Sequence, residues 1–125
     1  MSIIFKEIEK YMSGLTQDSD GKITASFIFP PEFIGFKGHF PNRPVLPGVC
    51  SIQAVTAIFK TLKKREVNLR EIVLAKFFTP VSANQELFFE CRSTKEENDQ
   101  SLVKVSVASG DGKKIAELQL KLSFK

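Results

Sequence analysis

Tryptophan is absent from the sequence, and the other residues with distinctive chemistry are scarce: one histidine, one tyrosine and two cysteines among 125 residues. The two cysteines, Cys50 and Cys91, have neither a metal-binding nor a redox spacing. We therefore expect no metal and no cofactor, and we expect both thiols to be reduced. Cys50 lies near the predicted start of a helix, where a thiolate is favoured, but a small buried residue is the commoner role.

Long apolar runs are also missing. No run is long enough to span a membrane, and no signal peptide leads the chain, so we expect a cytoplasmic protein that has no membrane partner. The net charge of +4 is mild. Basic residues are not interleaved with aromatic ones and no nucleic-acid-binding motif is present, which argues against nucleic acid as a partner.

Phenylalanine is the aromatic residue that the chain does use, with 12 copies. Its side chain brings apolar area without a polar tip, and therefore suits either a wholly apolar core or a tunnel for an apolar chain, the core being the commoner use. A length of 125 residues and a hydrophobic content of 42% predict one globular domain over residues 1–125.

Hydrophobic periodicity predicts an α+β protein. A short amphipathic helix is expected over residues 3–11, ended by Gly14, and a strand over 23–29. A long helix follows over 49–65. Four strands arranged as a meander are then expected over 71–78, 86–92, 103–107 and 118–124, with a charged hairpin tip at 95–100 and a tight turn at 110–112.

The long helix is apolar on nearly all sides in its first turns, which predicts that they are buried, while its polar residues gather at the end. The basic residues at that end are Lys60, Lys63, Lys64 and Arg65. They are typical of a solvated helix terminus. The alternative is a docking patch for an acidic partner, which would speed association more than it would strengthen binding.

The most unusual stretch is GHFPNRPVLPGV at residues 38–49, which leads into the long helix. It contains the only histidine, His39, and three of the six prolines. Prolines fix φ and remove amide donors, so the stretch is neither a helix nor a central strand but a stiff, irregular loop. Such a loop positions two groups: the imidazole of His39 and the free amides at the start of the helix.

This motif resembles the signature of the β-hydroxyacyl-acyl carrier protein dehydratases, and AKFFTPV at 75–81 resembles the later strand of that family and the turn after it. The resemblance covers roughly residues 20–125. It implies a hotdog fold, in which a curved antiparallel sheet wraps around one long central helix. It also implies a homodimer or higher homo-oligomer. In that family the active sites lie at the dimer interface, with the histidine from one chain and the helix residue from the other.

The resemblance implies the reversible dehydration of 3-hydroxyacyl thioesters carried by acyl carrier protein or coenzyme A, in fatty-acid or specialised lipid or polyene synthesis. His39 would be the base, and the Gly48 amide at the helix N-terminus would hold the thioester oxygen. Phe40, Pro47 and Val49 would contact the substrate, although packing and loop shape are the simpler roles for Phe40 and Pro47.

One position departs from the family pattern. The acidic catalytic residue is expected fourteen positions after the histidine, where this chain has Gln53. An amide cannot give up a proton near neutral pH. Three interpretations follow, in order of preference: His39 moves the proton alone while Gln53 positions the substrate; the chain is an impaired acyl-thioester-binding or heterodimer subunit; or it performs related thioester chemistry, such as hydrolysis or isomerisation.

Overall fold

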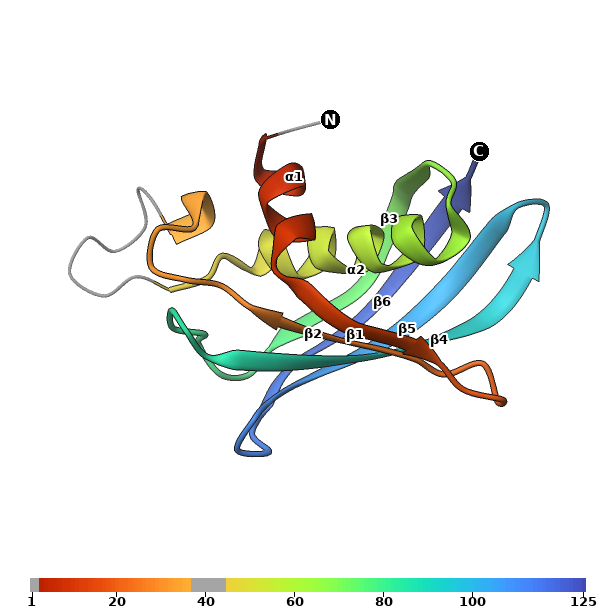
Figure 1. Ribbon diagram of the computed structural model, residues 1–125. Helices are drawn as coiled ribbons and strands as arrows, with labels where there is room; N and C mark the ends of the chain where they lie inside the picture. The colour runs from red at the N-terminus through yellow and green to blue at the C-terminus, as the bar shows by residue number, and fades with distance from the viewer. Residues whose placement is uncertain (1–2, 37–44) are drawn as a thin grey trace.

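The structure, a computed structural model, describes residues 3–36 and 45–125 (Figure 1). A six-stranded antiparallel sheet curves around one long helix, in agreement with the predicted α+β class (Figure 1). In chain order the elements are α1 Ile3–Lys10, β1 Met12–Gln17, β2 Ile23–Ile28, the short 3-10 helix η1 Ile34–Phe36, α2 Gly48–Lys63, β3 Val67–Phe77, β4 Glu86–Glu97, β5 Gln100–Ser109 and β6 Lys114–Phe124. Within the described ranges no helix is long and apolar enough to cross a membrane.

The core lies between α2 and the inner face of the sheet. The middle of α2 is buried almost all round, as its composition predicts, and its sole exposed residue before Thr61 is Val49. The helix ends where Lys64 adopts a left-handed conformation and its N–H caps the Lys60 carbonyl at 2.9 Å. Alternating residues of β4, β5 and β6 point toward α2 and are buried.

Most of the buried phenylalanines form a continuous aromatic cluster on one side of this core. The Phe29 ring stacks against Phe27 and Phe33 with centroid separations of 5.7 and 4.6 Å, and Phe89 and Phe36 extend the cluster by edge contacts. These five rings are therefore core residues, which is the commoner of the two uses considered for phenylalanine.

The sheet order is β1-β2-β4-β5-β6-β3, which corrects the predicted meander of four strands. Strand β3 pairs with β6 at one edge of the sheet and is not a neighbour of β4. The connection over residues 78–85 takes the chain from this edge, past β6 and β5, to the position of β4. Strand β4 also runs on to Glu97, and the hairpin tip is only Asn98 and Asp99, both at positive φ. Such a two-residue turn matches the twist of the strands and favours asparagine and aspartate.

Gly14 does not end the first helix. Helix α1 stops at Lys10, and Gly14 lies inside β1 with a φ of +63°, where the pairing of β1 with β2 is irregular between Ser13 and Thr16. A glycine that marks a bulge in an edge strand has the same sequence signal as one that ends a helix, since both need a positive φ.

Candidate functional site

The helix start is anchored to the segment that follows β3. The Leu46 N–H donates to the Val81 carbonyl at 2.8 Å, and the Cys50 N–H donates to the Pro47 carbonyl at 2.9 Å. Pro47 is the N-cap residue, with φ of −62° and ψ of 142°, and it provides no side-chain cap. The two predicted residues His39 and Phe40 lie outside the described residues.

Two backbone amides are free at this end of α2. The N–H groups of Gly48 and Val49 have no intrahelical acceptor, because these are the first two residues of the helix, and no acceptor for them occurs among the residues the structure describes. Their partial positive charge adds to that of the helix dipole. The predicted oxyanion donor, the Gly48 amide, is therefore at a helix N-terminus in the structure.

The Phe77 side chain lies directly against Gly48. A Cβ atom built on Gly48 would be 2.6 Å from Cζ and 2.9 Å from Cε2 of the Phe77 ring. Any larger residue at position 48 would therefore displace this ring, which is half exposed. Glycine at this position has a structural reason beyond substrate access: it lets an aromatic side chain of β3 cover the start of α2.

Gly48 and Phe77 border a pocket of about 440 Å³ at the same end of the helix. The lining is mainly apolar and comes from the end of the loop, the first turn of α2, the end of β3 and the start of β6. The residues that line it are Val45, Leu46, Gly48, Ser51, Phe77, Phe78, Thr79, Pro80, Val81 and Ile115. Its mainly apolar walls are compatible with an apolar ligand.

Of the predicted site residues in the described ranges, only Gly48 borders this pocket; Pro47, Val49 and Gln53 do not. Ser51, Phe77 and Phe78 were missed as site residues, although the AKFFTPV stretch was the signal that pointed to the last two. Cys50 lies in the same helical turn and is buried, and this burial raises the pKa of its thiol to about 11, which disfavours the thiolate.

Gln53 is half buried on α2. Its Oε1 atom is inaccessible to solvent and has no hydrogen-bond partner among the described residues, while its backbone carbonyl accepts a bond from Thr56 Oγ1 at 2.7 Å. A buried amide oxygen without a donor is costly, so its partner must come from outside these residues.

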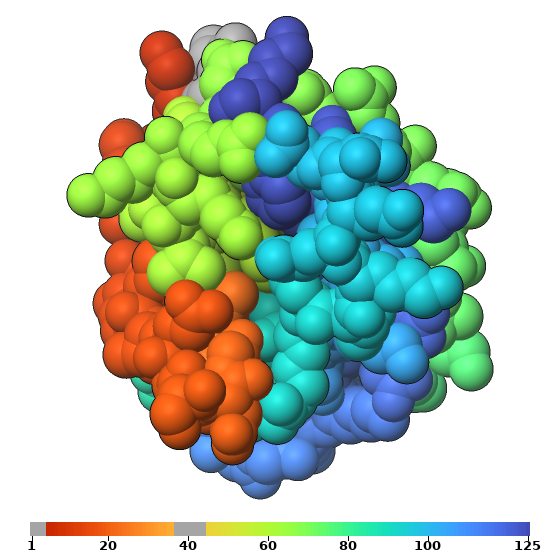
Figure 2. Space-filling model, turned by 90° about the vertical axis from the view of Figure 1, so that its right-hand side faces the viewer, coloured from red at the N-terminus to blue at the C-terminus, as the bar shows by residue number. Residues whose placement is uncertain are grey.

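The basic end of α2 is largely compensated inside the molecule. Lys63 pairs with Glu96 at 3.2 Å and Arg65 with Asp99 at 3.4 Å, and Figure 2 shows this helix end in yellow-green against the cyan β4–β5 hairpin. Lys60 pairs with Glu9 at 3.7 Å. These ion pairs favour the solvated-terminus interpretation over the docking patch.

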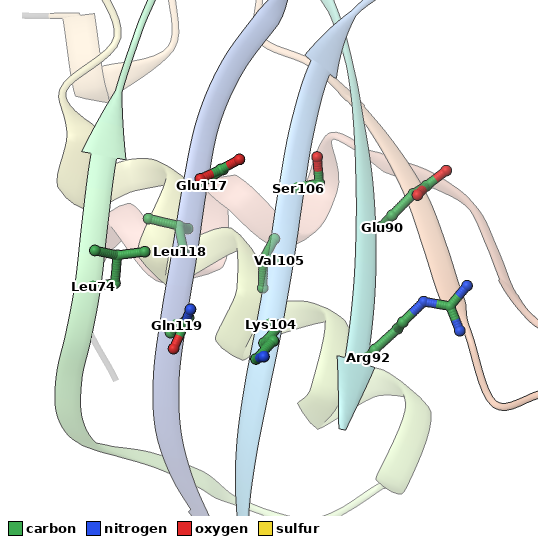
Figure 3. A pocket seen from close by; sticks show the side chains of 9 residues that line it. All are labelled: Leu74, Glu90, Arg92, Lys104, Val105, Ser106, Glu117, Leu118 and Gln119. Atoms are coloured by element: carbon green, nitrogen blue, oxygen red, sulfur yellow. The ribbon is translucent and has the colours of Figure 1, made fainter. Parts of the chain in front are cut away.

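A second pocket, of about 310 Å³, lies on the outer face of the sheet, away from α2 (Figure 3). Figure 3 shows Glu90 and Arg92 on β4, Lys104 and Ser106 on β5, and Glu117 on β6 beside it. Side chains of both charge signs standing on separate strands are typical of a solvated sheet face, and this pocket has no helix terminus beside it.

Comparison with known families and curated proteins gives a consistent result. The family model described as ApeI-like, ApeI dehydratase, matches residues 15–119. The 3-hydroxyacyl-[acyl-carrier-protein] dehydratase FabZ of Anaeromyxobacter sp. is 36% identical over 94 residues, which are 67% of this chain and 60% of that protein. FabZ of Vibrio cholerae is 35% identical over 95 residues, covering 69% and 61%. The matched region thus spans about three fifths of the length of these relatives.

Solved structures establish the fold. The dehydratase heterocomplex ApeI:P from Xenorhabdus doucetiae superposes with a TM-score of 0.76 at 22% identity, covering 90% of this chain and 96% of that chain. The PaaI protein of E. coli has a TM-score of 0.69 at 10% identity, covering 96% and 86%. The predicted hotdog fold is confirmed, and the chain belongs to the ApeI-like dehydratase family.

Proposed function

We propose that this protein catalyses the reversible dehydration of 3-hydroxyacyl thioesters to 2-enoyl thioesters. The observation that carries the proposal is the pair of free amides at the start of α2, beside an apolar pocket of about 440 Å³ and directly after the loop that bears His39. A thioester carbonyl at these amides would place its acyl chain along the apolar walls. The dehydratase names of the relatives agree with this chemistry.

The reaction requires a base for the C2 proton, an acid for the leaving hydroxyl and a donor for the thioester oxygen, and His39 serves as both base and acid. The His39 imidazole takes the proton from C2, and the negative charge that develops on the thioester oxygen is held by the Gly48 N–H. The electron pair then forms the C2=C3 double bond while the C3–O bond breaks. The imidazolium returns the proton to the leaving hydroxyl, which departs as water, so that His39 ends the cycle neutral.

Gln53 orients the substrate in this scheme. Its amide cannot serve as the acid, but its unpaired Oε1 accepts a hydrogen bond from the 3-hydroxyl group, which fixes the leaving group for elimination. Because Gln53 does not border the pocket that contains Gly48, we propose that it serves the site of a second copy in a homodimer. Phe40, Pro47 and Val49 complete the substrate contacts.

We propose acyl carrier protein as the carrier, with coenzyme A as the alternative. The names of the FabZ relatives specify acyl carrier protein, whereas a thioesterase structure from Streptococcus pneumoniae, with a TM-score of 0.69 at 5% identity, contains coenzyme A. The pathway is either fatty-acid synthesis or a specialised lipid or polyene synthesis. The whole of residues 1–125 is proposed to act as one domain.

The proposal is tested with purified protein and a 3-hydroxyacyl thioester, following the absorbance of the 2-enoyl product. We expect turnover by the wild type and a loss of about 10²–10⁴-fold in kcat for His39→Ala, the usual contribution of a general acid–base residue. The thermal unfolding of that variant should match the wild type, since the proline-rich sequence around His39 predicts a loop position and not a core one. Release of the free acid instead of the enoyl product would indicate a thioesterase and contradict the proposal.

A second candidate function is a catalytically impaired subunit that binds acyl thioesters and completes a heteromeric dehydratase. Gln53 favours it, because the position of the family acid holds an amide, and one structural relative is a heterocomplex. A wild type that binds a thioester but gives no enoyl product alone, and regains turnover only with a second dehydratase subunit, would favour this candidate.

A further inference from the structure

Ser51 is a polar residue in the wall of a mainly apolar pocket. It stands in the first turn of α2, is only 4% exposed, and borders the same pocket as Gly48. Its hydroxyl makes no hydrogen bond to a residue within the described ranges, and its oxygen retains some access to solvent. The usual acceptor for a helical serine is the carbonyl three or four residues earlier, here that of Gly48 or Pro47, and Ser51 donates to neither.

The comparison with the next hydroxyl on the helix is informative. Thr56 lies on the same helix, is also buried, and donates to the Gln53 carbonyl at 2.7 Å. Thr79, the other hydroxyl beside the pocket, donates to the Lys114 carbonyl at 2.9 Å. Of the two hydroxyls that border the pocket, that of Ser51 therefore has no acceptor among the described residues, and it is free to donate to a bound group.

Helix geometry directs this hydroxyl toward the free amides. Residues three apart share a helix face, and the Cα–Cβ bond of a helical residue tilts toward the N-terminus. The side chain of Ser51 consequently lies over the turn that begins with Gly48, and both residues border one pocket. An acceptor atom held by the Gly48 N–H would therefore lie on the same helix face as the Ser51 hydroxyl.

We propose that the Ser51 hydroxyl is a second donor to the thioester carbonyl oxygen and acts with the Gly48 N–H as a two-donor oxyanion site. The proposal rests on the proposed function, since it assigns a further catalytic residue to the same substrate. Elimination through an enolate-like transition state places its charge on that oxygen, so the second donor lowers the barrier more than it strengthens substrate binding.

The kinetic test is Ser51→Ala, with Ser101→Ala as a matched control. Ser101 is a buried serine, 2% exposed, whose Oγ also lacks a partner, but it lies on β5 away from the pocket. We expect Ser51→Ala to lower kcat by roughly 10²-fold with KM little changed, the usual effect of removing one oxyanion donor, while Ser101→Ala leaves both constants unchanged. An unchanged kcat, or a change confined to KM, would overturn the proposal.

A spectroscopic test does not depend on turnover. A saturated acyl thioester, hexanoyl coenzyme A labelled with heavy carbon at the carbonyl, cannot be dehydrated, and its carbonyl stretch falls when the oxygen accepts hydrogen bonds. We expect this infrared band to move to higher frequency in Ser51→Ala and to remain in place in Ser101→Ala. Equal bands in wild type and Ser51→Ala, or no binding of the thioester to either, would overturn the assignment. A shifted band together with an inactive wild type would support Ser51 and contradict the dehydratase function instead.

Discussion

At the scale of single residues, the chemistry is divided between the two sides of α2. Gly48 and Ser51 border the apolar pocket, whereas Gln53 does not, and its Oε1 atom has no partner within residues 3–36 and 45–125. Gln53 lies five positions after Gly48. On a helix of 3.6 residues per turn, this spacing places the two residues on different faces. Within one chain, Gln53 is therefore not brought next to Gly48. This separation is expected if each site takes its glutamine from a second copy of the chain.

We predict that Gln53→Glu raises dehydratase turnover by about tenfold or more, since a general acid contributes 10²–10⁴-fold when well placed. A carboxyl group at this half-buried position would have a raised pKa and stay partly protonated, so it could donate to the leaving hydroxyl. The same burial should lower the melting temperature. Steady-state kinetics and thermal unfolding check the two effects.

The control for this variant is Gln53→Met, which has a similar volume and neither donor nor acceptor. It should lower turnover by removing the substrate contact. If Gln53→Glu were slower than the wild type while Gln53→Met were equally slow, the amide itself would be the optimised group, and a carboxyl group would add nothing to the proton transfer by His39.

At the level of single residues, much of the site could be predicted from the sequence. The rest could not, and the reason is physical. The free amide of Gly48 follows from a proline loop that leads into a helix, which the sequence displays. The contact of Phe77 with Gly48 and the place of Ser51 beside the pocket depend on which strand passes the helix start. That information resides in the sheet order and not in local periodicity.

At the scale of elements, the packing of β3 on the start of α2 can be measured. We predict that Gly48→Ala destabilises the protein by about 1–3 kcal/mol, because the new methyl group would be placed 2.6 Å from the Phe77 ring. Phe77→Ala should remove this cost, so the two changes should be non-additive by about 1 kcal/mol in urea unfolding.

Gly110→Ala provides the matched control for that cycle. A Cβ atom at Gly110 would meet nothing closer than 3.9 Å, and the residue lies beyond β5, away from the pocket. Its effect should add to that of Phe77→Ala. Additivity for Gly48→Ala as well would mean that the Phe77 ring moves away freely and does not hold the helix start.

Helices and strands were predicted correctly where the hydrophobic pattern is long. The prediction failed where the structure depends on which strands pair with one another. The alternating pattern of Leu118, Leu120 and Leu122 gave β6, and the apolar run gave α2 to within two residues at each end. Strand β1 was missed because its alternating residues are half exposed or exposed and Gly14 interrupts them. The place of β3 beside β6 depends on long-range pairing that no local pattern encodes.

At the scale of the whole molecule, β3 is an edge strand whose apolar side chains are incompletely covered. Leu69, Ile72 and Phe77 oppose Leu122, Leu120 and Ala116 of β6 and so face the same side, yet they are about half exposed, at 40%, 48% and 51%, while their partners are buried. Val49 on α2 is also exposed. A long edge strand with an uncovered apolar flank favours pairing with another chain.

We predict a homodimer, or a larger assembly built from it, that associates through β3. Sedimentation at micromolar concentration should show a species of at least twice 14.0 kDa, and Ile72→Glu should shift it to the monomer. Phe88→Glu is the control, because Phe88 is 41% exposed on β4, where its buried neighbours Leu87 and Phe89 face the opposite side. A wild type that sediments only as a monomer would contradict both the dimer and the shared site.

The central claim is that water is removed from, or added to, C3 of an acyl thioester. Its most direct test is the incubation of a 2-enoyl thioester with the protein in water enriched in heavy oxygen, followed by mass spectrometry of the products. The account predicts that the heavy oxygen enters the 3-hydroxyl group of an intact thioester, and that His39→Ala abolishes this. Heavy oxygen in the carboxylate of a released free acid, or in no product at all, would contradict it.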